Sequence, residues 1–190
     1  SGQNKRRIES PYTTKVTGKN GFGKEITNEY ANAGFSDVML SSNGKYILAL
    51  TGVKERVKIW DYATGFLILD ALIPEPAPNA VRSTGFRWSA NCQYIAVGSP
   101  RADFNKIYNL KNPKNYLSAK LENCSEGAFS NDSKYYIFGN KLTHKIGFYN
   151  LENGDIAYTS DGHSDFITNI VLSPDGKTMC SASKDGELII

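Results

Sequence analysis

Short apolar strands alternate with polar turns along this chain, and the order of these segments repeats. The clearest unit lies at residues 162–190, where apolar positions at 167, 170 and 172 precede the turn Ser173–Lys177. Apolar positions in this pattern are typical of half-buried β-strands, and Pro-Asp-Gly is typical of a tight turn. No segment carries a convincing amphipathic helical pattern, so the sequence predicts an all-β fold.

Two independent markers give the period of the repeat. The first is a turn before a strand, centred at residues 44, 92, 133 and 176, which gives spacings of 48, 41 and 43 residues. The second is an aromatic residue with a polar successor, and it occurs at Trp60, Tyr108 and Tyr149. Each of these aromatic residues lies 16 residues after its turn centre. A period of about 40–45 residues is typical of four-stranded propeller blades.

Each complete unit contains four strand-like segments. One precedes the turn, a mostly apolar one follows it, a third ends at the aromatic residue, and a fourth follows a further turn. Apolar strands such as Tyr46–Leu50 are expected where both faces are buried between neighbouring sheets. The segment Ile73–Pro78 has three prolines in five residues and predicts an extended linker, which accounts for the longer first spacing.

These repeats define the expected domain organisation. Residues 1–34 are interpreted as an N-terminal tail with strands near 13–17 and 24–30, the second of which could close a propeller. Residues 35–190 form the repeat domain, with blades at approximately 35–78, 79–121, 122–161 and 162–190.

The last unit resembles a WD40 repeat, which is the blade of a family of β-propeller proteins. The resemblance rests on Gly162-His163 at its start, the Ser-rich segment 181–183 and the pair Asp185-Gly186. It implies an all-β propeller of WD40 type over about residues 35–190. The Trp-Asp pair of the family would fall just after residue 190. We therefore expect a partial propeller of about four blades, the last one incomplete, completed by C-terminal blades or by another chain.

In that family a histidine, a serine or threonine, an aspartate and the tryptophan form a buried hydrogen-bonded set. By position, the resemblance assigns His163, Asp185 and either Ser183 or Ser181 to this set. A buried imidazole and a buried carboxylate are costly unless they are paired, so we expect this set to be structural.

The three earlier units lack Gly-His at the matching place. We expect them to rely on the packing of Tyr108, Tyr149, Trp88 and Phe148. Only the first unit retains a Trp-Asp pair, and the expected blade anchors are Trp60 with Asp61, Tyr108 and Tyr149.

Composition narrows the functional classes. The net charge of +3 is too small to indicate a polyanion partner, and no apolar run is long enough for a membrane span. The N-terminal residues lack the apolar stretch of a signal peptide, so an intracellular location, cytoplasmic or nuclear, is expected. Three cysteines without metal-ligand spacing are consistent with reduced thiols. We expect no cofactor and no metal.

No catalytic signature is found. Residues 18–24 match the first seven positions of a phosphate-binding loop, but the eighth is Glu25, whose carboxylate would repel phosphate. Peptidase-associated propellers share the Ser-Pro-Asp-Gly turn, but Gly-His with Ser-x-Ser-x-Asp favours WD40.

The sequence therefore predicts a non-enzymatic interaction scaffold, a module of a larger protein or complex, whose partners are other proteins or peptides. One alternative is an RNA- or ribonucleoprotein-associated propeller, suggested by Lys5-Arg6-Arg7 and the many tyrosines. Another is a propeller attached to an enzyme outside this chain.

Overall fold

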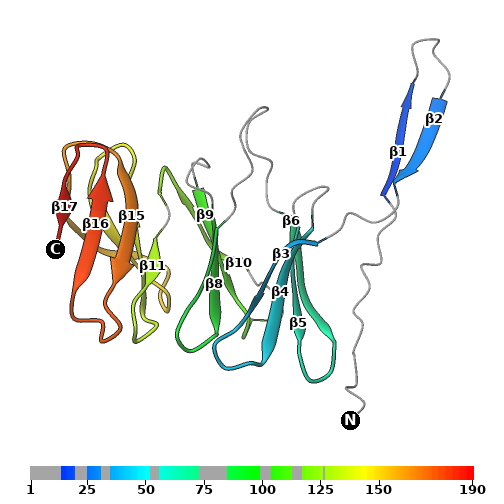
Figure 1. The fold of residues 1–190 in the computed structure, drawn as a ribbon, viewed down its shortest axis with the longest axis horizontal. Helices are drawn as coiled ribbons and strands as arrows, with labels where there is room; N and C mark the ends of the chain where they lie inside the picture. Colours follow the sequence, from blue (N-terminus) through cyan, green and yellow to red (C-terminus); the bar gives the residue numbers. More distant parts are fainter. Residues whose placement is uncertain are drawn as a thin grey trace. The chain divides into compact units, whose positions relative to one another are not determined.

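The computed structural model describes residues 14–19, 25–30, 35–51, 56–72, 85–98, 104–112, 117–125 and 127–190. The chain divides into two compact units, residues 1–40 with 44–74, and residues 41–43 with 75–190. Every regular element in the described residues is a β-strand, and the sheets are antiparallel (Figure 1). The predicted all-β, blade-like architecture is therefore confirmed.

The first unit contains a hairpin and a four-stranded sheet. The hairpin consists of β1 (Thr14–Lys19) and β2 (Glu25–Tyr30), which pair with each other. The sheet contains β3 (Phe35–Leu40), β4 (Tyr46–Thr51), β5 (Arg56–Asp61) and β6 (Leu67–Leu72), paired in chain order. Both N-terminal strands were predicted, and a propeller-closing role for β2 stays a prediction.

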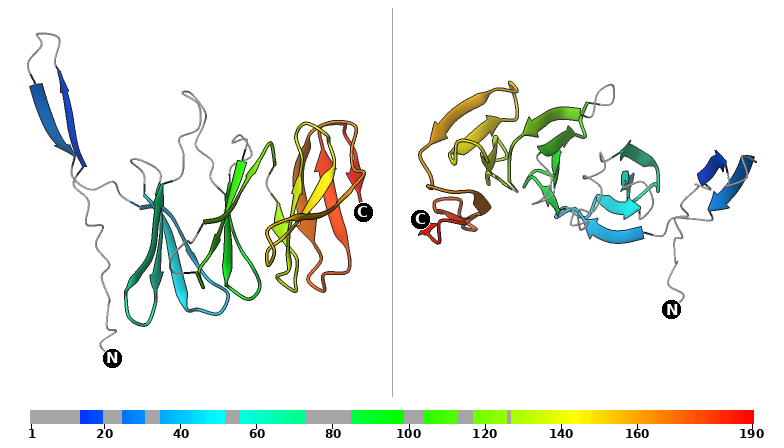
Figure 2. Two further views of the ribbon diagram at one scale, coloured as in Figure 1. Left: turned by 180° about the vertical axis from the view of Figure 1, so that it is seen from behind. Right: turned by 90° about the horizontal axis from the view of Figure 1, so that it is seen from above.

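The second unit contains three sheets, which follow one another in chain order in both views of Figure 2. The first has β7 (Gly85–Trp88), β8 (Tyr94–Gly98), β9 (Phe104–Asn109) and β10 (Leu117–Glu122). The next has β11 (Ala128–Phe129), β12 (Tyr135–Gly139), β13 (Ile146–Asn150) and β14 (Ile156–Ser160). The last has β15 (Ile167–Leu172), β16 (Met179–Ser183) and β17 (Leu188–Ile189).

The core lies between sheets, as the apolar second strands predict. All five residues of β8 are buried, and one apolar cluster joins β8 and β9 to β12 and β13 through Tyr94, Ile107, Tyr136 and Tyr149. A second cluster joins β12 and β13 to β15 through isoleucines. Such strands are apolar on both faces because a neighbouring sheet covers each face.

The three aromatic anchors each lie one residue before the end of the third strand of their sheets, and all are buried. Trp60 is 5% exposed, Tyr108 3% and Tyr149 4%. Burial raises the pKa of Tyr108 to about 12, because the phenolate loses its hydration. Asp61 has a different role, since its carboxylate accepts hydrogen bonds from the backbone N–H and hydroxyl of Thr64 and thereby closes the next turn.

A serine that the sequence analysis did not single out begins each turn between the first two strands. Its hydroxyl donates to the Asn or Asp two residues later, at 2.6–2.8 Å, in the pairs Ser41–Asn43, Ser89–Asn91, Ser130–Asp132 and Ser173–Asp175. The next position has a left-handed backbone at Gly44, Cys92, Ser133 and Gly176. The recurring Ser-x-Asn/Asp pattern could have revealed this turn.

Three predicted features lie outside the described residues. They are the basic cluster at residues 5–7, the linker at 73–78, and residues 20–24 of the loop that resembles a phosphate-binding loop.

Candidate functional site

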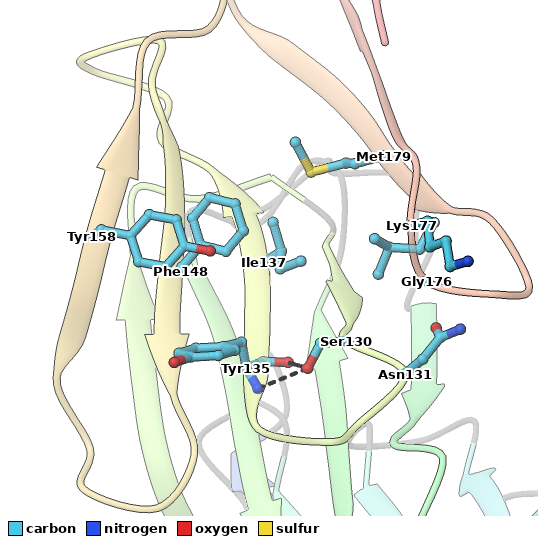
Figure 3. A pocket seen from close by; sticks show the side chains of 10 residues that line it. Ser130, Asn131, Tyr135, Ile137, Phe148, Tyr158, Gly176, Lys177 and Met179 are labelled. Atoms are coloured by element: carbon cyan, nitrogen blue, oxygen red, sulfur yellow. Dashed lines mark hydrogen bonds between the residues drawn. The ribbon is translucent and has the colours of Figure 1, made fainter.

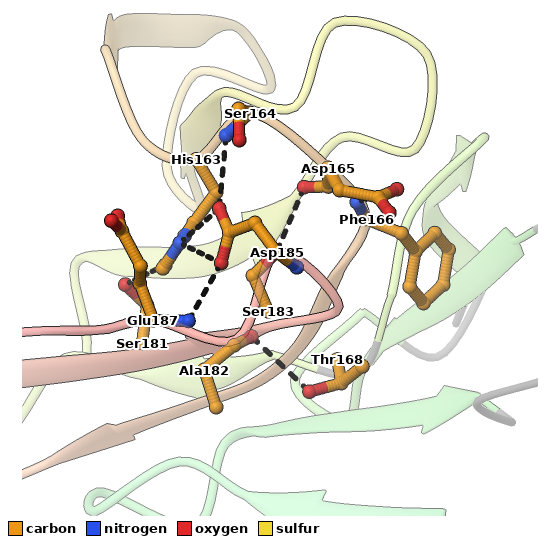
Figure 4. Close-up of polar contacts among 10 residues, drawn as sticks. All are labelled: His163, Ser164, Asp165, Phe166, Thr168, Ser181, Ala182, Ser183, Asp185 and Glu187. Atoms are coloured by element: carbon orange, nitrogen blue, oxygen red, sulfur yellow. Dashed lines mark hydrogen bonds and ion pairs between the residues drawn. The ribbon is translucent and has the colours of Figure 1, made fainter.

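The side chains of Ser181 and Asp185 both contact the buried imidazole of His163 (Figure 4). His163 precedes β15, Ser181 lies on β16, and Asp185 lies in the turn before β17. The imidazole Nδ1 is 2.9 Å from Asp185 Oδ2, and Nε2 is 2.9 Å from Ser181 Oγ. Because a carboxylate can only accept, Nδ1–H donates to Asp185, and Nε2 shares a hydrogen bond with the Ser181 hydroxyl.

Asp185 also gathers two backbone amides. The N–H of Ser164 donates to its Oδ2 at 3.0 Å, and the N–H of Glu187 donates to its Oδ1 at 2.9 Å. Burial acts to raise the pKa of Asp185, but these amides and the imidazole of His163 outweigh burial and lower the pKa to about 2. The carboxylate is therefore ionised at neutral pH and holds both the loop before β15 and the turn before β17.

The structure distinguishes the two serines that the sequence left open. Ser181 is 1% exposed and contacts the imidazole. The Ser183 hydroxyl instead donates to the carbonyl of Asp165 at 3.0 Å and accepts from the N–H of Asp185 at 3.2 Å. Ser183 thus links the turn to the preceding loop without contacting His163 in the described hydrogen bonds.

The glycine of the Gly-His pair has a steric role. A Cβ at Gly162 would lie 2.8 Å from the carbonyl oxygen of His144, and the N–H of His163 donates to that same oxygen at 3.2 Å. The loop can approach the β12–β13 hairpin this closely because Gly162 has no side chain.

The order Asp185–His163–Ser181 resembles a hydrolytic triad, but the serine is in the wrong environment. A nucleophilic oxygen must be reached by substrate, whereas Ser181 lies almost fully buried beneath the imidazole. Among the described residues, His163, Asp185 and Glu187 also place potential metal ligand atoms within 4.8 Å of one another. Both ring nitrogens are already hydrogen-bonded, so a metal would have to displace Asp185 or Ser181. The set is best suited to joining loops.

The family comparison agrees with this geometry. The model of the family "WD domain, G-beta repeat" matches residues 154–190, which contain the whole polar set. This match identifies one WD40 repeat, at residues 154–190. The match begins before β14, so the family's repeat takes in the outer strand of one sheet and the first strands of the next.

A curated WD40 relative extends the similarity beyond this repeat. The WD repeat-containing protein SL1-17 of Schistosoma mansoni is 26% identical over 160 residues, which cover 82% of this chain and 49% of the relative. The chain therefore spans about half the length of this relative. Within the described residues, no helix is long and apolar enough to cross a membrane.

A buried polar contact also occurs in the sheet of β7–β10, which lacks Gly-His. The amide of Asn105 on β9, itself 1% exposed, donates to the carbonyl of Ser125 at 2.6 Å. A Cβ at Gly98 would lie 1.6 Å from the Asn105 amide oxygen, so this glycine makes room for the amide. This sheet therefore combines aromatic packing with a buried amide contact, and nothing in the strand sequence Phe-Asn-Lys-Ile-Tyr-Asn sets Asn105 apart beforehand.

Three loops of the two last sheets meet around Phe166, which is half-buried. The ammonium groups of Lys141 and Lys184 each lie 5.2 Å from the centre of the Phe166 ring. The N–H of Lys184 donates to the carbonyl of Phe166 at 3.0 Å, and the polar set joins these loops further. We call Lys141, Phe166 and Lys184 the loop surface.

A recess of about 240 Å³ lies between the sheet of β11–β14 and the last sheet (Figure 3). Tyr158 and Phe148 border one side, and Lys177 lies on the other. The rings of Phe148 and Tyr158 stack with centroids 4.1 Å apart. Ile137, Leu172 and Met179 supply further apolar lining. We call this recess the tyrosine groove.

Proposed function

We infer that this chain shares the general role of WD40 repeats, which act as protein-interaction scaffolds without catalytic activity of their own. We propose that this chain is such a scaffold, a module of a larger protein or complex, and that its loop surface binds a peptide segment of a partner protein. The observation that carries this proposal is the convergence of three loops on Phe166, with two lysine ammonium groups at 5.2 Å. Binding residues are disproportionately found on loops that a rigid scaffold positions.

The polar set supports this role because it fixes the loops in advance. His163 and Asp185 join the loop before β15 to the turn before β17, and His163 also bonds to the β12–β13 hairpin. A surface that is ordered before binding loses less conformational entropy when the partner arrives.

The loop surface favours a segment that combines an apolar side chain with a carboxylate. Phe166 offers an aromatic contact, and Lys141 and Lys184 offer positive charge. The exposed Asp165 precedes Phe166 and its carboxylate accepts from the N–H of Phe166, so a highly acidic segment would meet some repulsion.

Selection of displayed peptides on the full chain tests the proposal. We expect selected peptides to lose at least about tenfold in affinity when Phe166 is replaced by alanine, because aromatic residues dominate protein interfaces. Phe66→Ala is the matched control, since Phe66 is also a surface phenylalanine, 73% exposed, and lies in the other unit. If no selected peptide binds the Phe166→Ala variant more weakly than the wild type, the loop surface is removed from the proposal.

RNA binding is the alternative to peptide binding as the function of this chain. It rests on the basic residues 5–7 and is measured with a labelled single-stranded RNA oligonucleotide. Affinity that falls steeply with salt would favour the ribonucleoprotein role, because phosphate contacts release counterions. The intracellular location stays a prediction.

A further inference from the structure

Strand β14, the fourth of its sheet, has no charged residue, whereas the fourth strands β6 and β10 of the preceding sheets do. β6 contains Asp70, and β10 contains Lys120 and Glu122, whereas β14 reads Ile-Ala-Tyr-Thr-Ser. Proteins commonly place charges or proline on sheet edges to prevent pairing with other chains. β14 lacks both devices, although Ile156 is 47% exposed and Tyr158 is 52% exposed.

The backbone of β14 is available along one edge. The strand order of its sheet is β11-β12-β13-β14, so β14 pairs with β13 and ends the sheet in the described structure. All five of its residues are exposed. Such an edge presents a row of backbone donors and acceptors to an incoming strand.

The tyrosine groove opens beside this edge. The Tyr158 ring stacks on Phe148, and Tyr135 lies edge-on to Tyr158 at 6.1 Å. The volume of about 240 Å³ lies below the roughly 300–1,000 Å³ that is usual for small-molecule sites. The groove is therefore matched to one large side chain better than to a cofactor.

We propose that β14 is a docking edge for an extended segment of a partner protein, which adds a fifth strand and inserts one apolar side chain into the tyrosine groove. A residue opposite Tyr158 on an added strand would have its Cβ about 4.5–5.5 Å from the Cβ of Tyr158. Main-chain hydrogen bonds supply affinity in this mode, and the side-chain pocket supplies specificity. This surface is separate from the loop surface, and the two can be tested independently.

The positive charge of Lys177 beside the groove indicates which kind of segment binds there. The exposed Lys177 borders the groove and forms no ion pair with the residues that the structure describes. A segment with a carboxylate close to its apolar anchor would complement it. A second copy of this chain, paired through its own β14, would bring only uncharged side chains, so a partner peptide is the better match.

The test begins with peptide selection on the full chain carrying Phe166→Ala, so that ligands of the loop surface are not recovered. The probes are displayed random decapeptides. We expect the selected peptides to share a large apolar residue close to Asp or Glu, and to protect the β14 amides from hydrogen exchange. Tyr158→Lys should weaken binding at least about tenfold, because it removes a groove wall and charges the edge.

Two control variants, Thr159→Lys and Lys134→Glu, separate the effect of the groove from the effect of a changed charge. Thr159→Lys puts the same charge on the same strand, but on the opposite sheet face, so less than about a threefold loss is expected. Lys177→Glu should weaken the acidic peptides several-fold at low salt, whereas Lys134→Glu should not, since Lys134 holds the equivalent place in the preceding turn, outside the groove. If Tyr158→Lys fails to fold, Tyr158→Ala replaces it.

The proposal is overturned if no peptide is selected, or if Tyr158→Lys and Thr159→Lys behave alike. It is also overturned if the wild type self-associates in sedimentation and Tyr158→Lys abolishes this, because the occupant is then a second copy. None of these results bears on the Phe166 experiment, whose peptides are selected on the wild-type surface.

Discussion

At the scale of single residues, His163 shows why a buried polar group can be useful in a repeat. Its ring nitrogens and backbone N–H bond to three different segments, namely the turn before β17, strand β16 and the β12–β13 hairpin. Hydrogen bonds are directional, so this residue fixes how the loops meet in a way that apolar contacts alone would not.

Ser181 and Ser183 make a matched pair for testing this role. Ser181→Ala should lower the free energy of unfolding by about 1–3 kcal/mol, because it leaves a buried imidazole nitrogen without its hydrogen-bond partner. Ser183→Ala should cost about 1 kcal/mol or less, since water can reach the partners of this more exposed hydroxyl. Urea denaturation measures both, and a larger loss for Ser183→Ala would contradict the assignment.

Asp185 predicts a pH dependence. Its pKa of about 2 lies below the roughly 3.9 of an unfolded aspartate, so its contribution is fully present above about pH 4 and is lost as the pH falls toward 2. The Tm of the wild type should therefore exceed that of Asp185→Asn most clearly above pH 4, and the difference should shrink toward pH 2. Asp155→Asn, at an exposed turn position, controls for the loss of one charge. A difference that is constant across this range would refute the linkage.

At the scale of elements, several turns after strands share a left-handed backbone at their fifth residue. In one of these turns that residue is not glycine. In the turns that begin at Asp61 and Asn150, the fifth residue has a left-handed backbone and is Gly65 or Gly154. In the turn that begins at Asn140, the same position is His144, with φ of 58°. A side chain there adds strain that glycine avoids.

His144→Gly should therefore stabilise the chain by up to about 1 kcal/mol, after the entropy cost of glycine is taken into account. His144→Ala is the control, because it removes the same side chain and keeps the left-handed strain. The midpoint of urea unfolding measures both variants. Equal stability of the two would show that backbone strain is not the cause.

At the scale of the whole molecule, neighbouring sheets of the second unit are joined by turn contacts as well as by apolar packing. The N–H of Asn91 donates to Ser133 Oγ at 3.0 Å, and the Asn131 amide donates to the carbonyl of Pro174 at 2.7 Å. Repeat proteins derive much of their stability from such nearest-neighbour interfaces. The same stacking creates the tyrosine groove and the loop surface, which both combine residues of two successive sheets.

The sequence by itself determined the all-β class, the repeat period, the buried aromatic anchors and the resemblance of the last unit to a WD40 repeat. These follow from local patterns, because strand alternation, turn residues and a fixed spacing are written along the chain. It also placed His163 and Asp185 in one set, but only through resemblance, and it left Ser181 and Ser183 open because both lie on the same strand.

Only the tertiary structure decided which serine reaches the imidazole, which glycines make room for a neighbour, and where surfaces form. Tyr158, Ile137 and Lys177 belong to two repeats, and nothing in their spacing indicates that they border one groove. The uncharged edge of β14 is visible in the sequence, but its significance depends on the groove that packing places beside it. Contacts between sheets are set by side-chain packing over long sequence distances, which a local pattern does not encode.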